Sequence, residues 1–368
     1  MALGSTKLKL LFMGSDSFSR LSLKSMIKGG ISDKYTIDVL SPPKGRRDTP
    51  IHKFHKYWES EGFNVDVIPG KDVKSEWKEY LNERMGDYDA GIVSSFRHMV
   101  PGSVIDKFIK PRTDASLNFP NNFLYWIHPS LLPKYRGACP IQHTLLNADT
   151  ETGVTLIHVA KRKFDAGNIV AQTKLIVEDT DIYGTLRDKL AIEGGILAAR
   201  LLHSDLEAAN RESQVQDKEK MTKAPLFEDK DASYLDFTKG DSQTILRTYK
   251  AFARSSVVPS THIEIKKDIF RLAFDDLEWV DPTNEADMRV LEEVKDVTDI
   301  PNGAIHWNKK IAKNLMFVKW SDNKWLKFSS VRIANIGKLD ASQLMINYFQ
   351  NKKYRQSDPV FYFKLCSD

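Results

Sequence analysis

The sequence lacks several features that would identify a class of protein at once. Only two cysteines, Cys139 and Cys366, stand among its 368 residues, so a disulfide framework is excluded and a reduced compartment is expected. No apolar run reaches the ~18 residues that a membrane-spanning helix needs. There is also no internal repeat and no low-complexity tract. What remains is a chain with 41% hydrophobic residues, which is ample for a core and long enough for more than one domain.

The sequence also has little excess of charge. Its 54 Lys and Arg residues outnumber its 49 Asp and Glu residues by five, for a formal net charge of +5. Such a mild excess does not by itself indicate nucleic-acid binding, because local clustering matters more than the sum. The stretch Met1–Thr6 is short and neutral, and therefore does not resemble an Arg-rich mitochondrial presequence.

Strand-like apolar runs alternate with helix-like patterns through the N-terminal half. The runs are Leu8–Met13, Tyr35–Leu40, Val65–Ile68 and Ala90–Val93. This alternation predicts an α/β fold with a doubly wound, mostly parallel sheet, in which ligands bind beyond the carboxyl ends of the strands. The first such end, Gly14–Ser17, lacks the G-x-G-x-x-G pattern, so NAD is not indicated.

The stretch from His128 to Gly137 is the most informative part of the chain. It reads His-Pro-Ser-Leu-Leu-Pro-Lys-Tyr-Arg-Gly, and its prolines and glycine exclude a continuing helix or central strand. A loop that holds an imidazole, a hydroxyl and two cations is typical of segments that a scaffold holds for binding or chemistry. About thirty residues later, after the apolar run Val154–Val159, comes Phe-Asp-Ala-Gly at Phe164–Gly167.

In order and spacing these motifs resemble the signature of the folate-dependent formyltransferases. The resemblance covers His128–Gln142, Asp149–Thr155 and Phe164–Ile169, which is far more specific than one short motif. It implies a Rossmann-like catalytic domain and 10-formyltetrahydrofolate as the formyl donor, with no metal. A zinc site at His52 and His55 is rejected, because no matching further ligands lie nearby in the sequence.

Within this family the closest resemblance is to the members that formylate methionyl-initiator tRNA, because a long C-terminal extension follows. We expect a catalytic domain over residues 1–203, a polar linker over 204–228 and an OB-like tRNA-binding domain over 229–368. Short runs such as Tyr234–Phe237 and Trp325–Val331 predict strands of a β-rich barrel there. Lysines interleaved with tryptophans in this domain indicate either a surface that tracks an RNA backbone or ordinary outer faces of strands.

Formyl transfer to an amine makes defined demands on side chains. It passes through a tetrahedral oxyanion that needs a cationic or hydrogen-bonding partner, and the attacking amine must lose a proton. A nearby carboxylate keeps an imidazole charged and can relay that proton through water. The resemblance assigns these roles to an Asn-x-His pair and a later Asp. His128 and Asp165 match by position, and we expect both to be catalytic.

The asparagine is where the sequence departs from the family. Trp126, rather than Asn, stands two residues before His128. Upstream, Ala115–Phe119 resembles the strand that leads to the motif, and removing residues 120–127 would restore the spacing for Asn118. We therefore expect Asn118 to be the third catalytic residue and the intervening residues, through Trp126, to loop outward as an insertion. Rival donors within the insertion are Asn121 and Asn122, and loss of the amide role is the remaining alternative.

The resemblance also implies binding residues. The folate-binding segment corresponds to Ser130, Leu131, Leu132 and Pro133, and a rigid loop with two leucines can flank a flat heterocycle.

For tRNA we expect Arg136 to be a binding residue, because its guanidinium suits a carboxylate or phosphate. The loop that carries Lys44, Arg46 and Arg47 is expected to join it, because Lys and Arg neutralise phosphates. A solvated turn is the alternative for that loop.

Three functions remain open from the sequence. The preferred one is formyl transfer from 10-formyltetrahydrofolate to methionyl-initiator tRNA for translation initiation. The second is formyl transfer to a small amine such as an amino sugar or glycinamide ribonucleotide, and the third is tRNA binding by a protein with a decayed site. No membrane and no obligate protein partner are expected. The departures from the compact bacterial pattern resemble fungal mitochondrial members, so we expect the mitochondrial matrix, with the bacterial cytoplasm as the alternative.

Overall fold

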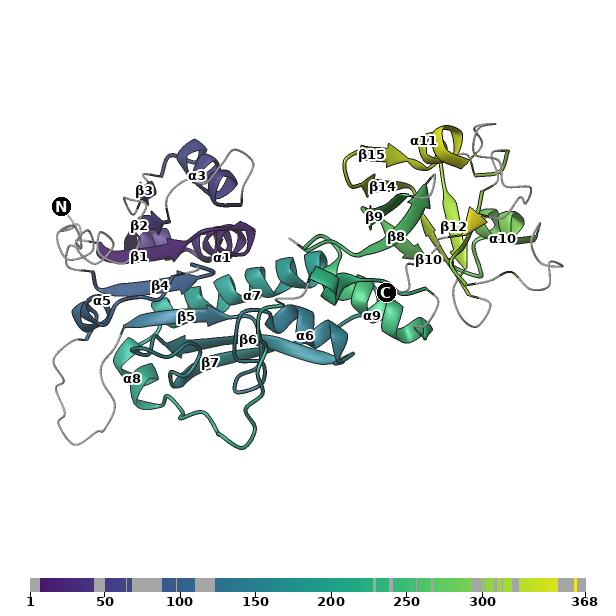
Figure 1. Ribbon diagram of the computed structural model, residues 1–368. Coiled ribbons are helices and arrows are strands. Elements are labelled where there is room, and N and C mark those ends of the chain that lie inside the picture. Colours follow the sequence, from purple (N-terminus) through teal and green to yellow (C-terminus); the bar gives the residue numbers. More distant parts are fainter. Residues whose placement is uncertain are drawn as a thin grey trace. The chain divides into compact units, whose positions relative to one another are not determined.

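The computed structural model divides the chain into two compact units (Figure 1). Unit 1 comprises Met1–Ile141, Asp149–Asp179 and Thr185–Leu226, and unit 2 comprises Gln142–Ala148, Thr180–Gly184 and Phe227–Asp368. The structure describes residues 7–42, 50–63, 65–67, 88–96, 98–109, 123–227, 230–237, 241–255, 257–265, 268–292, 300, 302–307, 310–312, 314–319, 324–349 and 361–362. Each unit has its own sheet or sheets and its own hydrophobic core.

Unit 1 is built on a seven-stranded sheet in the order β3-β2-β1-β4-β5-β6-β7. The strands are β1 (Leu8–Gly14), β2 (Tyr35–Ser41), β3 (Val65–Val67), β4 (Ala90–Ser94), β5 (Leu124–His128), β6 (Glu151–His158) and β7 (Ile169–Ile176). Strands β1 to β5 pair in parallel, whereas β6 pairs antiparallel with both β5 and β7. The prediction of an α/β fold with a mostly parallel sheet is confirmed.

Strand β5 corrects one expectation. Leu124–His128 pairs in parallel with β4 and antiparallel with β6, so it is a central strand. The prediction that residues 120–126 loop outward is therefore wrong from Leu124 onward. The reason is hydrophobic burial, because Leu124, Tyr125 and Ile127 are at most 1% exposed in the sheet.

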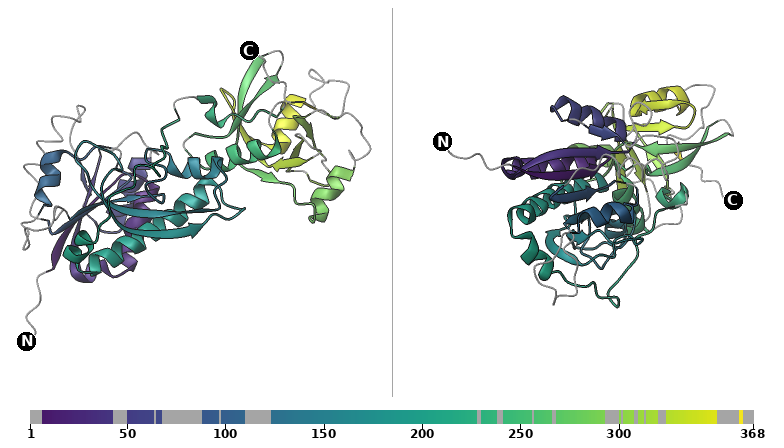
Figure 2. Two further views of the ribbon diagram at one scale, coloured as in Figure 1. Left: turned by 90° about the horizontal axis from the view of Figure 1, so that it is seen from below. Right: turned by 90° about the vertical axis from the view of Figure 1, so that its left-hand side faces the viewer.

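Helices cover this sheet, and one of them approaches β5 very closely. These helices are α1 (Ser17–Lys28), α2 (Ile31–Lys34), α3 (Pro50–Ser60), α5 (Gly102–Lys107), α7 (Tyr183–His203) and α8 (Leu206–Arg211). A further helix, α6 (Pro140–Leu146), begins in unit 1, but its residues from Gln142 onward belong to unit 2. A Cβ at Gly194 of α7 would lie 2.6 Å from Cγ2 of Ile127, and one at Gly195 would lie 2.2 Å from the carbonyl oxygen of Ser22 on α1. The two glycines thus let α7 lie directly against β5 and beside α1 (Figures 1 and 2).

The segment that follows α7 is folded rather than extended. Residues 204–228 were predicted as a linker from their polar composition. They contain α8, and residues up to Leu226 belong to unit 1. In the part of the chain that the structure describes, no helix has the length and apolar character needed to cross a bilayer.

Unit 2 consists of two antiparallel sheets. A five-stranded sheet has the order β10-β13-β12-β11-β16, and a four-stranded sheet has the order β15-β14-β9-β8. The strands are β8 (Ser260–Ile265), β9 (Asp268–Phe274), β10 (Leu277–Trp279), β11 (Ala304–His306), β12 (Met316–Lys319), β13 (Trp325–Phe328), β14 (Ser330–Ile333), β15 (Gly337–Asp340) and β16 (Phe361–Tyr362). The helices are η1 (Lys230–Ser233), α9 (Ser242–Phe252), α10 (Glu285–Glu292), α11 (Ala341–Leu344) and η3 (Met345–Phe349).

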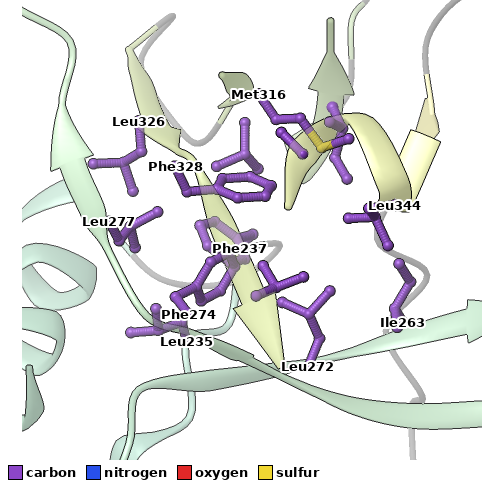
Figure 3. Packing of buried hydrophobic residues seen from close by; sticks show 14 of the residues in the cluster. Leu235, Phe237, Ile263, Leu272, Phe274, Leu277, Met316, Leu326, Phe328 and Leu344 are labelled. Atoms are coloured by element: carbon purple, nitrogen blue, oxygen red, sulfur yellow. The ribbon is translucent and has the colours of Figure 1, made fainter. Parts of the chain in front are cut away.

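One hydrophobic cluster joins the two sheets of unit 2. Phe274 of β9 and Phe328 of β13 meet edge to face with ring centroids 5.2 Å apart, and Phe237 packs on Phe274 at 6.0 Å (Figure 3). The predicted strand Tyr234–Phe237 is instead irregular chain, in which Tyr234 makes a single bridge and Phe237 fills this core. The unit is β-rich, as predicted.

Candidate active site

His128 ends β5 with its ring almost fully buried, at 2% exposure. Its Nδ1 lies 3.3 Å from Oδ1 of Asp165, and its Nε2 lies 3.0 Å from the carbonyl oxygen of Tyr135. A carbonyl oxygen can only accept a hydrogen bond, so Nε2 carries a proton in this arrangement. Nδ1 faces the Asp165 carboxylate. The ring is therefore held in one orientation, between a carbonyl oxygen and a carboxylate.

Asp165 follows β6 in a turn and is 8% exposed. Its φ of 50° lies in the left-handed region, which non-glycine residues seldom adopt. Its Oδ2 accepts the N–H of Gly137 at 3.0 Å. Burial raises the pKa of this carboxyl, but the charge and hydrogen bond of His128, the Gly137 N–H and the charge of Arg136 outweigh it and hold the pKa below the ordinary 3.8. Asp165 is thus a buried, ionised carboxylate at neutral pH.

The predicted folate-binding segment is a rigid loop beside this pair. The Ser130 hydroxyl donates to the Lys134 carbonyl at 2.6 Å, and the Leu132 N–H donates to Oγ1 of Thr155 at 3.0 Å. The amide of Gln172 donates to the Leu132 carbonyl at 2.9 Å and to Thr155 at 2.8 Å. Ser130 and Leu132 are buried and hold the loop's shape. The other two predicted residues, Leu131 and Pro133, are partly exposed and remain accessible to a ligand.

The predicted tRNA-binding residues divide into two groups. Arg136 is described, and its Nε donates to Oε1 of Gln216 at 2.8 Å. Its guanidinium is therefore partly committed within unit 1. Residues 43–49, which carry Lys44, Arg46 and Arg47, lie outside the described residues, so their role stays a prediction.

Trp126 occupies the position at which the Asn-x-His motif of the family has its asparagine. It stands two residues before His128 and therefore shares a face of β5 with it. Its side chain lines a small pocket together with Asp165, Met99 and Val100. Asn118, Asn121 and Asn122 lie outside the described residues, so the catalytic role of Asn118 stays a prediction.

Several supporting residues were not predicted from the sequence. Thr155 and Gly137 lie within the recognised motifs, so their positions in these motifs could have identified them as supporting residues of the site. Gln172 lies on β7 three residues beyond the last motif. Gln216 lies in the segment predicted as a linker, where composition carries no sign of a contact with the site.

A larger hollow of about 850 Å³ lies away from this pair, between α1 and α7. Its lining is mainly apolar, with Leu21, Ile192 and Ile196 below the basic residues Lys24, Lys28 and Arg200. It contains neither an acid–base pair nor a residue of the recognised motifs, so we do not assign the chemistry to it. Among the residues that the structure describes, no group of three or more His, Cys, Asp or Glu side chains is placed to hold a metal ion.

Known proteins similar to this chain point to one activity. A family model described as formyl transferase matches residues 66–201. Methionyl-tRNA formyltransferase of Wolbachia sp. subsp. Drosophila simulans is 30% identical over 274 residues, which are 74% of this chain and 82% of that protein. The enzyme of the same name from Lactobacillus acidophilus is 30% identical over 240 residues, which are 65% of this chain and 71% of that protein.

Two solved structures share the fold. HypX from Aquifex aeolicus in complex with tetrahydrofolic acid has a TM-score of 0.60 at 13% identity, over 97% of this chain and 51% of that one. An N-formyltransferase from Helicobacter canadensis, in complex with folinic acid and dTDP-3-aminofucose, has a TM-score of 0.53 at 16% identity, over 88% of this chain and 99% of that one. At these identities the likeness concerns the fold alone.

The sheet, the His128–Asp165 pair and the family model together define a formyltransferase. The two relatives named above, each 30% identical to this chain, are matched over 82% and 71% of their own length. The chain belongs to the methionyl-tRNA formyltransferase family.

Replacing Asp165 with Asn should lower turnover by ~10²–10⁴-fold, because the amide keeps the shape but neither the charge nor the proton acceptor. His128→Ala should lower turnover by a similar factor.

The free energy of unfolding should depend on pH, since the folded-state pKa of Asp165 lies below 3.8. Ionised Asp165 stabilises the fold above that pH, and the contribution is lost as the pH falls through the folded pKa.

The free energy of unfolding of wild type and Asp165→Asn, measured by denaturant titration, should therefore differ at neutral pH and converge only below pH 3.8. The control is Asp106→Asn, whose carboxylate pairs with Lys161 and is half exposed. It should change neither turnover nor the pH dependence. Near-normal turnover of Asp165→Asn would contradict the assignment.

Proposed function

We propose that the chain transfers the formyl group of 10-formyltetrahydrofolate to the α-amino group of methionyl-initiator tRNA, which prepares this tRNA for translation initiation. The observation that carries the proposal is the buried His128–Asp165 pair, in a chain 30% identical to a methionyl-tRNA formyltransferase over 274 residues. The pair lies at the carboxyl end of β5, which is the edge where α/β sheets bind ligands.

The reaction forms a bond between the amine nitrogen and the formyl carbon and breaks the bond between that carbon and N10 of the folate. The formyl oxygen becomes an oxyanion on attack, the amine nitrogen loses a proton and N10 gains one. In this mechanism the His128 imidazole acts as an imidazolium and stabilises the oxyanion by its positive charge. Asp165 accepts the amine proton through water and relays it toward N10.

The loop Ser130–Pro133 and its apolar neighbours suit the donor substrate. Leu131 and Pro133 present apolar surface from a loop that hydrogen bonds hold rigid. Met99 and Trp126 add apolar surface in the pocket that contains Asp165. The exposed apolar surface of Leu131 and Pro133 suits one face of a flat heterocycle, whose polar edge is recognised by a few backbone groups.

Unit 2 supplies the tRNA-binding surface in this proposal, as an OB-like domain. Two antiparallel sheets around one core are compatible with that architecture. Lys319 donates to a backbone carbonyl at 2.6 Å and Lys327 lies 2.7 Å from Asp287, so these two lysines act within the unit. Lys324 lies 5.7 Å from the ring centroid of Trp279, a cation–aromatic combination suited to a single RNA strand.

The test supplies labelled 10-formyltetrahydrofolate with methionyl-initiator tRNA, glycinamide ribonucleotide or a dTDP-amino sugar as acceptor. We expect transfer to methionyl-tRNA with kcat/KM at least ~10²-fold above that for either small amine. Uncharged initiator tRNA is the control, since it lacks the α-amine. Preferred transfer to a small amine would overturn the proposal in favour of the second function, and no transfer to any acceptor would favour a decayed site.

Trp126 offers a hydrogen-bond donor at the position where the family motif has its asparagine. An indole N–H can only donate, and Trp126 lines the pocket beside Asp165. We infer that this N–H meets the formyl oxygen as the oxyanion develops, so that the substitution alters the donor without removing it.

Trp126→Phe should then lower kcat by about 10²-fold, because one oxyanion donor is lost while the apolar lining stays. Trp126→Asn should retain more activity than Trp126→Phe, because it restores an amide N–H. Steady-state kinetics with methionyl-tRNA measures both. Equal activity of wild type and Trp126→Phe would remove the indole from the mechanism and return the role to Asn118.

Changing Lys44, Arg46 and Arg47 together to Ala should raise the KM for methionyl-tRNA and flatten its salt dependence, because phosphate contacts release counterions. The KM for the folate should hardly change. The matched control removes three cations from the hollow between α1 and α7, at Lys24, Lys28 and Arg200. If both triple variants respond alike, the basic loop acts only through net charge.

We further propose that the enzyme works in the mitochondrial matrix. The departure from the Asn-x-His spacing at Trp126 and the form of the first loop, Gly14–Ser17, support this proposal over a bacterial cytoplasm. Protease protection of the tagged protein in isolated mitochondria tests it, and a bacterial source organism would rule it out.

A further inference from the structure

The segment after α8 runs alongside the catalytic loops. We call residues 213–224 the strap. Gln214 exchanges two backbone hydrogen bonds of 2.8 Å with Ile169. Farther along, backbone hydrogen bonds form a short ladder between the strap and the loop that follows His128. In this ladder the strap N–H groups of Thr222 and Ala224 donate to the carbonyl oxygens of Pro133 (3.3 Å) and Arg136 (2.7 Å). The loop N–H groups of Arg136 and Cys139 donate to the carbonyl oxygens of Thr222 (2.9 Å) and Ala224 (3.0 Å). The strap therefore contacts both segments that form the site.

The strap approaches the catalytic loop at Gly137 so closely that no side chain fits. Gly137 has a φ of 132°, and a Cβ on it would lie 2.4 Å from the carbonyl oxygen of Ala224. This is the glycine whose N–H donates to Asp165. The path of the strap thus determines where that N–H points.

The Gln216 side chain of the strap reaches the backbone of the Asp165 turn. It is 5% exposed. Its Nε2 donates to the carbonyl oxygens of Asp165 at 2.9 Å and Gly167 at 2.7 Å, while its Oε1 accepts from Nε of Arg136 at 2.8 Å. The opposite amide orientation would set oxygen against two carbonyls and NH₂ against a guanidinium, so the hydrogen-bond partners determine the orientation.

One amide therefore links the two segments that must meet for Asp165 to work. The Asp165 turn is in the left-handed region, a conformation that persists when surrounding contacts fix it. Gln216 fixes it from the carbonyl side. At its other end the same amide holds Arg136, the residue before the Gly137 N–H donor.

We propose that Gln216 is a positioning residue for formyl transfer, which aligns the Asp165 carboxylate with His128 by tying the Asp165–Gly167 turn to Arg136. This inference rests on the proposed function of the His128–Asp165 pair. Gln216 touches neither substrate in this role, so its removal should lower kcat while the KM for the folate stays nearly unchanged.

The test compares Gln216→Met with Gln214→Met. Methionine matches the length of glutamine but makes none of the three hydrogen bonds. Gln214 is exposed and makes its strap contacts through its backbone, so it is a matched control. Gln216→Met should lower kcat by about 10²-fold and change the KM for the folate less than threefold, whereas Gln214→Met should leave both unchanged.

Two further readouts separate positioning from a purely structural role. In a double-mutant cycle, Gln216→Met should cost little in a protein that already carries Asp165→Asn, because both changes act through the same carboxylate. The acid limb of the pH–rate profile should also move to higher pH in Gln216→Met, because a displaced Asp165 loses the contacts that lower its pKa. Full additivity with an unmoved acid limb would overturn the proposal.

If Gln216→Met fails to fold, Gln216→Glu replaces it in the test. This variant keeps the side-chain length and the acceptor for Arg136 but loses both donors. It should also lower kcat at constant KM for the folate, and wild-type kcat would overturn the proposal. If Asp165→Asn is itself fully active, the proposed function of the pair fails. If Asp165→Asn is inactive but Gln216→Met behaves like Gln214→Met, only the positioning role fails.

Discussion

The ion pair between His128 and Asp165 lies almost out of contact with solvent, where an isolated charge is strongly unfavourable. Each atom of the pair that faces protein therefore has a partner of matching chemistry: the Tyr135 carbonyl for Nε2, the Gly137 N–H for Oδ2. These partners come from one loop, which explains why that loop is so tightly bonded to β6, β7 and the strap. The chemistry depends on loops, but the loops are held by the sheet.

Much of unit 1 could be predicted from the sequence, because its signals are local. Apolar runs predicted β1, β2 and β4, and the motif identified His128 and Asp165, which the fold brings together while their catalytic role stays a prediction. The helix α9 of unit 2 has apolar residues at helical spacing after Asp241, whose carboxylate caps it. Strand β5 was not predicted, because restoring the Asn-x-His spacing of the family requires an insertion where the apolar residues before His128 form this strand. The unbroken apolar run from Phe123 to Ile127 is typical of a strand buried on both faces.

The rest of the site could not be read from the sequence for a different reason. The strap is polar and makes its contacts through backbone groups and one buried amide, and neither leaves a periodic pattern. Gln214 and Gln216 are the same residue type two positions apart, yet one is exposed and the other is 5% exposed. Only the fold of the neighbouring loops separates them.

The strap also bears on how the catalytic unit can be produced alone. A fragment cut at residue 203, where composition suggests a boundary, would lack α8 and the strap. In this fragment Nε of Arg136 and the carbonyl oxygens of Asp165 and Gly167 would lose their hydrogen bonds to the Gln216 amide. A fragment that ends at Leu226, the end of unit 1, keeps this part of the polypeptide intact. The choice of terminus thus decides whether the fragment contains the contacts between the strap and the Asp165 turn.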